Sequence, residues 1–434
     1  MPRTNTARIH TARIHPTRVR TIRSLSLAAL TAVTLAGCAS TSPPAEQPAE
    51  TSTPHGFVEG AAEAAEPQLH LAALSGAGEI TLLDLLDESS DTLGTVDAAS
   101  AVSTDGRYLF VSSQTTGELS VIDTGVWTVD HEDHFHYYRA EARVVGSLEG
   151  QGEAVVSSGP TVTGVWFAES GEGILLDTAA LGTGEITEVA RITGNPHPGV
   201  LVPFGDAVLA TGANAEGIAS RVDVLGTDGT PTASAGAACE ALSGSITTRV
   251  GVVFGCADGA LLATTSADGI TFESIPYPAD ALADGAGVST ADRALKFRNR
   301  EGRPSVAAVA GTRGAWILDT RERTWTLLPS DVPLLQVSAA DDTGDHVVAL
   351  AADGRVLVLD AAAGTLLAST EPILATSLTD PSLTAGVELT VDATRAYVNS
   401  PADNLLYEID YADGARIART FDVDSPAFLA ETGR

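Results

Sequence analysis

The 434-residue sequence has few basic residues, and its charge is therefore strongly one-sided. It contains 25 lysines and arginines, with Lys296 as the single lysine, against 56 aspartates and glutamates, and its formal net charge is −31. Such a surface repels the phosphates of nucleic acids and anionic lipids, so a nucleic-acid partner is not expected. It attracts cations, although solubility or adaptation to salt explains the same charge without a ligand.

Motifs of the common enzyme classes are also missing. The sequence has no Gly-x-Ser-x-Gly, no glycine-rich phosphate loop before a helix and no His-Glu-x-x-His. Carboxylates are so frequent that no pair stands out as a general acid and base. We therefore do not expect an enzyme.

Long hydrophobic runs are absent after the N-terminal region. Six arginines, an apolar run from Leu25 to Leu35 and the sequence Leu35-Ala36-Gly37-Cys38 predict a lipoprotein signal peptide over residues 1–37 and a lipidated Cys38. The apolar run is too short for a membrane-spanning helix. Residues 38–66 are rich in Ser, Thr, Pro, Ala and Glu and predict a disordered tether. The protein is expected to be extracytoplasmic and anchored to the cell membrane by its lipid.

The remaining segment, residues 67–434, shows short apolar strands and no sustained helical period. Aliphatic residues followed by aspartate recur at intervals of roughly 40 to 57 residues once two poorer copies are counted, as in four-stranded propeller blades. Asp-Gly pairs such as Asp105-Gly106 and Asp353-Gly354 suit tight turns between antiparallel strands. We predict an all-β fold, a β-propeller of seven or eight four-stranded blades. An array of β-sandwiches is the alternative. The repeat comprises Leu83-Asp84, Ile122-Asp123, Leu176-Asp177, Leu318-Asp319, Leu359-Asp360 and Ile409-Asp410.

Cysteine is scarce: besides Cys38, only Cys239 and Cys256 occur. An even pair in an exported domain predicts a disulfide, with an expected contribution of about 3 kcal/mol in the chain-entropy model. Metal ligation by the two thiols is the alternative.

Histidines are concentrated in one stretch, residues 130–138, which holds three of the nine in the chain. The stretch is an insertion between the strand ending at Asp123 and the strand at residues 142–148, and long insertions are often functional. If it is extended, His134 and His136 point to the same face because strand side chains alternate. Imidazole and carboxylate ligands suit a transition metal, but further ligands are needed. The alternative is a solvated acidic loop.

His197 is a candidate for one of those further ligands. It lies in Gly194-Asn195-Pro196-His197-Pro198-Gly199, at the entrance to a predicted blade. A turn histidine that packs on a neighbouring side chain explains the pattern equally well.

The sequence resembles extracytoplasmic zinc metallochaperones of the AztD type, which are β-propellers that pass zinc to the solute-binding protein of a zinc ABC transporter. This resemblance implies the same fold, cargo and partner. It also implies zinc binding by His134 and His136, with His131, Asp133 and His197 as further ligands. The matching stretches are His131 to Tyr138, Pro196 to Pro203, Val253 to Gly259 together with Cys239, and Arg395 to Asn399.

Three positions where the family carries inner-strand histidines differ in this chain. The stretches are Glu153-Ala154-Val155-Val156, His197-Pro198-Gly199 and Leu242-Ser243-Gly244. Two alternatives to a metallochaperone follow. One is a propeller that docks a partner protein after its metal site has decayed. The other is a metal-dependent propeller hydrolase, in which acidic channel residues bind calcium and polarise a substrate oxygen.

Overall fold

The computed structural model describes residues 60–131, 134–267, 269–279 and 288–434. The predicted signal peptide, Cys38 and the tether up to residue 59 lie outside the described residues. All described residues belong to one unit, Thr53–Arg434. Among them, no helix has both the length and the apolar composition needed to cross a membrane.

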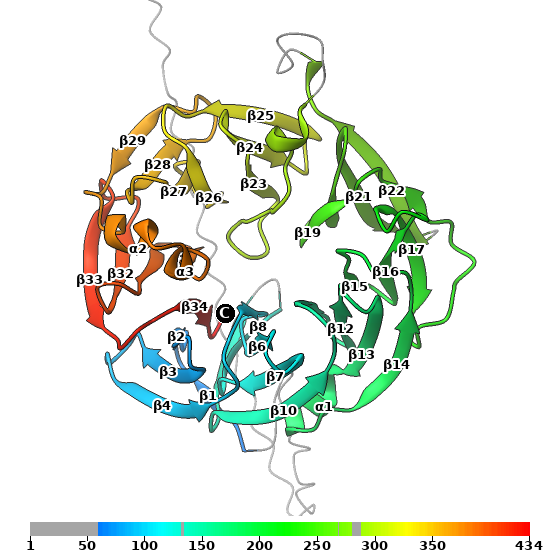
Figure 1. The fold of residues 1–434 in the computed structure, drawn as a ribbon, viewed down its shortest axis with the longest axis horizontal. Coiled ribbons are helices and arrows are strands. Elements are labelled where there is room, and N and C mark those ends of the chain that lie inside the picture. Colours follow the sequence, from blue (N-terminus) through cyan, green and yellow to red (C-terminus); the bar gives the residue numbers. More distant parts are fainter. Residues whose placement is uncertain (1–59, 132–133, 268, 280–287) are drawn as a thin grey trace, which may run out of the picture. The chain divides into compact units, whose positions relative to one another are not determined.

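Antiparallel sheets stand around a central channel as the blades of a propeller (Figure 1). In the described part of the chain the ring has eight sheets, seven with four strands and one with three. The predicted propeller is therefore correct. Of the two predicted blade numbers the structure has eight, and one blade departs from the predicted four strands.

The first four blades, numbered in chain order with strands given from the channel outwards, are as follows. Blade 1 has β34 (Phe428–Thr432), β2 (His70–Leu74), β3 (Glu79–Asp84) and β4 (Ser90–Thr95). Blade 2 has β5 (Ala101–Thr104), β6 (Tyr108–Ser113), β7 (Glu118–Asp123) and β10 (Arg143–Glu149). Blade 3 has β11 (Ala154–Ser158), β12 (Val162–Phe167), β13 (Glu172–Asp177) and β14 (Glu188–Thr193), with helix α1 (Thr178–Thr183). Blade 4 has β15 (Leu201–Phe204), β16 (Ala207–Ala213), β17 (Ala219–Gly226) and β18 (Ala237–Ala238).

The other four blades complete the ring. Blade 5 has β19 (Ser243–Thr247), β20 (Val252–Cys256), β21 (Gly259–Ser266) and β22 (Gly269–Pro276). Blade 6 has β23 (Ser305–Val309), β24 (Gly314–Asp319) and β25 (Thr324–Pro329), preceded by the 3-10 turn η2 (Thr290–Asp292). Blade 7 has β26 (Leu334–Ala339), β27 (His346–Ala351), β28 (Val356–Asp360) and β29 (Leu366–Ser369). Blade 8 has β30 (Leu389–Val391), β31 (Ala396–Ser400), β32 (Leu405–Asp410) and β33 (Arg416–Asp422), after helices α2 (Ala375–Thr379) and α3 (Pro381–Thr384).

The two ends of the described chain close the ring in blade 1. Strand β34 pairs antiparallel with β2 over five residues, from His70 opposite Thr432 to Leu74 opposite Phe428. The first and last segments of the described chain thus form one blade together. Ring closure removes the exposed sheet edges that an open array would leave, and it excludes the β-sandwich alternative.

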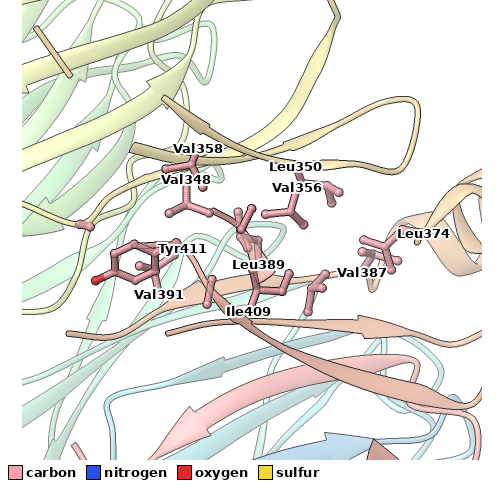
Figure 2. Packing of buried hydrophobic residues seen from close by; sticks show 14 residues of the cluster. Val348, Leu350, Val356, Val358, Leu374, Val387, Leu389, Val391, Ile409 and Tyr411 are labelled. Atoms are coloured by element: carbon pink, nitrogen blue, oxygen red, sulfur yellow. The ribbon is translucent and has the colours of Figure 1, made fainter. Parts of the chain in front are cut away.

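Neighbouring blades bury their apolar side chains against one another. Between blades 7 and 8, Val348 and Val358 lie opposite Leu389 and Ile409, all at most 1 % exposed (Figure 2). The middle strands of a blade are covered on both faces, so β6 and β12 are buried at every residue. Each such aliphatic side chain contributes about 1.5–3 kcal/mol by leaving water.

The recurring aspartates mark one place in the blade: each ends the strand that lies next to the outermost one. Their carboxylates accept hydrogen bonds from the backbone N–H groups of the following turn, as Asp177 does from Ala179 and Ala180, and Asp360 from Ala362 and Ala363. An aspartate side chain stabilises a turn in this way when it bonds the backbone two residues on. The repeat therefore marks the turn that follows this strand.

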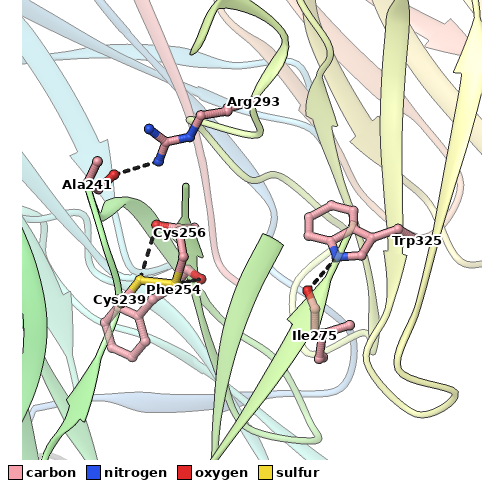
Figure 3. Close-up of a disulfide and its surroundings, with 8 residues drawn as sticks. Cys239, Ala241, Phe254, Cys256, Ile275, Arg293 and Trp325 are labelled. Carbon is pink, nitrogen blue, oxygen red and sulfur yellow. Dashed lines mark hydrogen bonds between the residues drawn. A yellow bond between two sulfur atoms is a disulfide. The ribbon is translucent and has the colours of Figure 1, made fainter. Parts of the chain in front are cut away.

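Cys239 and Cys256 form a disulfide, so their thiols are not free to bind a metal (Figure 3). Cys239 follows β18 of blade 4, and Cys256 ends β20 of blade 5. Both residues are buried in the apolar cluster between these blades, beside Phe254. The bond thus joins two neighbouring blades covalently.

Candidate metal centre

The histidine stretch folds as a β-hairpin inserted between β7 and β10 of blade 2. Strand β8 (Val126–Asp130) pairs with β9 (Phe135–Arg139), and Asp130 stands opposite Phe135. Both strands are rich in β-branched and aromatic residues, which favour extended backbone. A backbone hydrogen bond of 2.9 Å from His131 N to His134 O closes the turn. Strands β8 and β9 thus give the insertion the form of a β-hairpin.

His131, His134 and His136 gather at the tip of this hairpin. One nitrogen from each ring lies within 4.8 Å of the others, and the ring centroids are 4.9–5.2 Å apart. His134 directly precedes β9, and it lies beside His136 on that strand, as expected for residues two apart in extended backbone. His131 joins them because β8 and β9 run antiparallel, so the residue after β8 lies beside the residue before β9. The cluster thus draws its imidazoles from both sides of the turn.

The spacing of one pair of ring nitrogens is close to that of two zinc ligands. His134 Nε2 and His136 Nε2 are 3.1 Å apart. Two nitrogens bound at about 2.0–2.1 Å to a tetrahedral ion lie about 3.3 Å apart. This pair is thus close to the separation that an ion bound to both nitrogens requires. His134 is exposed, while His131 and His136 are half-buried, so the site opens to solvent.

A carboxylate that the sequence analysis missed completes the surroundings of the cluster. Strand β1 (Ala62–Ala64) pairs with β9 and makes the hairpin a three-stranded sheet. Glu63 Oε1 lies 2.7 Å from His136 Nδ1. Strand β1 lies within residues 38–66, the segment predicted as a tether. Ala62–Ala64 has little β propensity of its own, so only its pairing with β9 explains the strand.

Aromatic packing fixes the base of the hairpin. Trp127 and Tyr138 face each other across the strand pair with ring centroids 5.3 Å apart, and both are buried. The Arg107 guanidinium lies 3.7 Å from the centre of the Trp127 ring. Arg107 also donates two hydrogen bonds to Asp123, of 3.0 and 2.8 Å. The hairpin is thereby tied to the second and third strands of blade 2.

Polar contacts hold the hairpin over one end of the ring. Arg139 Nη1 donates to Asp84 of blade 1 at 2.9 Å, and Thr128 Oγ1 donates to the Gly433 carbonyl at 2.7 Å. Near the tip, Asp130 is 3.9 Å from Arg249, in the turn between β19 and β20 of blade 5. The hairpin therefore contacts blades on both sides of the channel.

The channel contains a cavity of about 990 Å³ beside the β8–β9 hairpin. Trp127 and Thr128 line it together with residues of the innermost strands. Its wall is charged: Arg434 forms ion pairs with Glu431, at 3.5 Å, and with Glu301, at 3.7 Å. Burial raises the pKa of Glu431 to about 7. Among the described residues, the channel carboxylates do not form a cluster of three ligands comparable to the hairpin histidines.

His197 does not join the hairpin cluster. It is 3 % exposed, its ring packs against Trp166 at 4.7 Å, and its Nδ1 donates to the Asn195 carbonyl at 2.6 Å. Its Nε2 lies 3.1 Å from Thr211 Oγ1. Both ring nitrogens are thus engaged inside the protein, which is the packing alternative of the sequence analysis. Asp133, the remaining predicted ligand, lies outside the described residues.

Comparison with solved structures shows a likeness to AztD. The crystal structure of Citrobacter koseri AztD superimposes with a TM-score of 0.69 at 18 % sequence identity, covering 85 % of this chain and 98 % of that one. The structure of apo AztD from the same organism gives a TM-score of 0.68 at 18 % identity, with the same coverage. The chain has an AztD-type fold. No protein-family model and no curated protein sequence matches it. Among the described residues of this ring, three histidines that could hold a metal ion gather on the β8–β9 hairpin inserted in blade 2.

Proposed function

We propose that this chain binds zinc on its β8–β9 hairpin and passes the ion to the solute-binding protein of a zinc ABC transporter. The observation that carries the proposal is the gathering of His131, His134 and His136 within 4.8 Å. Three neutral imidazoles are a typical ligand set for zinc. Calcium, the ion of the propeller-hydrolase alternative, prefers oxygen ligands and fits this set poorly.

The arrangement suits a carrier that must release its cargo. Three protein ligands leave a fourth position of a tetrahedral ion for water or for a ligand from another protein. The exposure of His134 gives such a ligand access. A ligand from the partner can therefore bind the ion before the hairpin histidines dissociate from it. The ion is then transferred without being released into solution.

The AztD-type fold supports the same role and suggests the partner. The acidic surface favours the approach of a cation and of complementary basic surfaces. We assign no catalytic step to the chain: the hairpin carries imidazoles and aromatic rings, and the work proposed for it is binding and release. His197 is left out of the proposed ligand set, while Asp133 remains a candidate by sequence alone.

The proposed location is outside the cytoplasm, on the cell membrane. The N-terminal sequence supports cleavage before Cys38, lipidation of that cysteine and a tether that leads to the propeller. The Cys239–Cys256 disulfide agrees with an oxidising compartment. A lipid-tethered carrier stays close to a membrane transporter and to its binding protein.

Zinc titration of the full chain tests the proposal. We expect one ion to bind with micromolar or tighter affinity, and the double variant His134→Ala/His136→Ala to lose this binding while its thermal unfolding stays unchanged. His346→Ala is the matched control, because its imidazole pairs with Asp342 in blade 7. Unchanged binding in the double variant would contradict the proposal. Absence of binding in the wild-type chain would favour a docking protein with a decayed site.

A further inference from the structure

Strand β1 places one acidic side chain on the histidine face of the hairpin. Glu63 stands directly opposite Tyr138 in the antiparallel pair, and His136 is two residues away on β9. Directly opposite residues share a face, and diagonal neighbours two residues apart are within reach of long side chains. Glu63 is therefore on the same face as His136, and its carboxylate reaches the ring diagonally.

The contact determines which nitrogen of His136 carries the proton. A carboxylate oxygen accepts hydrogen bonds, so at 2.7 Å from Glu63 Oε1 the Nδ1 atom of His136 is the donor. In a neutral imidazole the other nitrogen then has a free lone pair. That nitrogen, Nε2, is the one that faces His134 Nε2 at 3.1 Å. The lone pair thus points into the cluster.

We infer that Glu63 is a positioning residue that orients His136 and holds it in the tautomer that binds metal through Nε2. This inference rests on the proposed zinc site. Carboxylates that accept from the second nitrogen of a metal-bound histidine fix the ring and increase its basicity, and their loss weakens metal binding by about 10–100-fold.

The geometry distinguishes this role from direct ligation. The ligand atoms within 4.8 Å of one another belong to His131, His134 and His136, and the Glu63 carboxylate is outside that group. It contacts the nitrogen of His136 that is remote from the cluster. A carboxylate in this position acts on the ion through the imidazole.

The inference gives the segment before the ring a function. Strand β1 pairs with three residues of β9, from Tyr137 to Arg139, and lies at the edge of the three-stranded sheet. Glu63 is separated from His136 by 73 residues. The segment that joins the proposed tether to the propeller consequently completes the site. A protein that displaces β1 would separate Glu63 from His136 and so remove the carboxylate that orients this imidazole.

The test compares Glu63→Ala, Glu63→Gln and the control Glu66→Ala in the full chain, with His136→Ala measured alongside. Glu66→Ala removes the same charge from the same segment, so it reports any general effect of charge. Zinc affinity is measured by competition with a chromophoric chelator, and the visible spectrum of bound Co²⁺ reports the ligand set. Selective ¹⁵N labelling of histidine reports the His136 tautomer without metal.

We expect Glu63→Ala to weaken zinc binding about 10–100-fold and to redistribute the His136 tautomers, with the Co²⁺ spectrum unchanged. Glu63→Gln should recover part of the affinity, since its amide oxygen still accepts from Nδ1, and Glu66→Ala should behave as wild type. Wild-type affinity in Glu63→Ala would overturn the inference, and so would equal losses in both Glu63 variants with an altered Co²⁺ spectrum, which would indicate direct ligation. If His136→Ala also binds zinc normally, the proposed site itself is wrong.

Discussion

Replacing Glu431 with glutamine should change how the stability of the ring depends on pH. Glu431 lies on β34, the strand that closes the propeller, and its side chain is 0 % exposed. Its Oε1 has no hydrogen-bond partner, and Oε2 accepts from Thr390 at 3.3 Å. Burial disfavours the charged form and raises the pKa to about 7, despite the nearby Arg434 guanidinium.

The size and sign of the effect follow from the two pKa values of this carboxyl group. Its pKa is about 7 in the folded chain and 4.5 in its ordinary state. Between these values the folded state retains a proton that the unfolded state loses, so stability decreases as pH rises and the loss is complete above about pH 7. At about 1.4 kcal/mol per pKa unit the full contribution is about 3 kcal/mol, of which about 2.5 kcal/mol is lost between about pH 5 and pH 8.

Urea unfolding of the wild type and Glu431→Gln at these two pH values measures the effect. The glutamine variant cannot ionise, so we expect its unfolding free energy to fall by about 2.5 kcal/mol less than that of the wild type over this range. Any constant cost of burying the amide cancels in this difference. Glu322→Gln, on an exposed turn, is the control. Equal pH dependence of Glu431→Gln and wild type would refute the reasoning.

Three further predictions concern the hairpin, the disulfide and the buried histidine. Trp127→Ala should destabilise the base of the hairpin by about 3–5 kcal/mol, which faster proteolysis of the hairpin would reveal. The same variant should weaken zinc binding at least about tenfold in a titration, whereas Trp127→Phe should retain most of the affinity. Cys239→Ser/Cys256→Ser should lower the free energy of unfolding in urea by about 3 kcal/mol and leave the zinc stoichiometry unchanged. A free energy of unfolding equal to that of the wild type would contradict a stabilising role of the disulfide. His197→Ala should lower the free energy of unfolding by about 2–4 kcal/mol with zinc affinity unaltered, and a loss of zinc binding would restore it as a ligand.

The fold could be predicted from the sequence because its regularities are local. Each aliphatic-aspartate pair marks the end of the strand next to the outermost one and the turn that follows, so six copies such as Asp177 and Asp360 reveal a repeated blade. The number of blades was left open because the closing strand β34 pairs with β2, at the opposite end of the chain. Strand pairing over such a distance leaves no pattern in either segment.

The candidate site was predictable only in part, for the same reason. His134 and His136 share a face through the alternation of a strand, which a sequence displays directly. Glu63 reaches His136 through a strand pair 73 residues away, and its flanking alanines give no sign of a strand. His197 has the sequence context of a turn ligand, but its ring nitrogens are engaged by Asn195 and Thr211, and only the packed structure reveals that.

Locating the bound ion tests the central claim most directly. Crystals of the full chain grown with zinc can be measured on both sides of the zinc absorption edge, and the anomalous difference map marks the ion independently of any assumed ligands. We expect one strong peak between the ring nitrogens of His131, His134 and His136. A peak on the carboxylates of the central cavity, or none at the hairpin despite zinc bound in solution, would contradict the account.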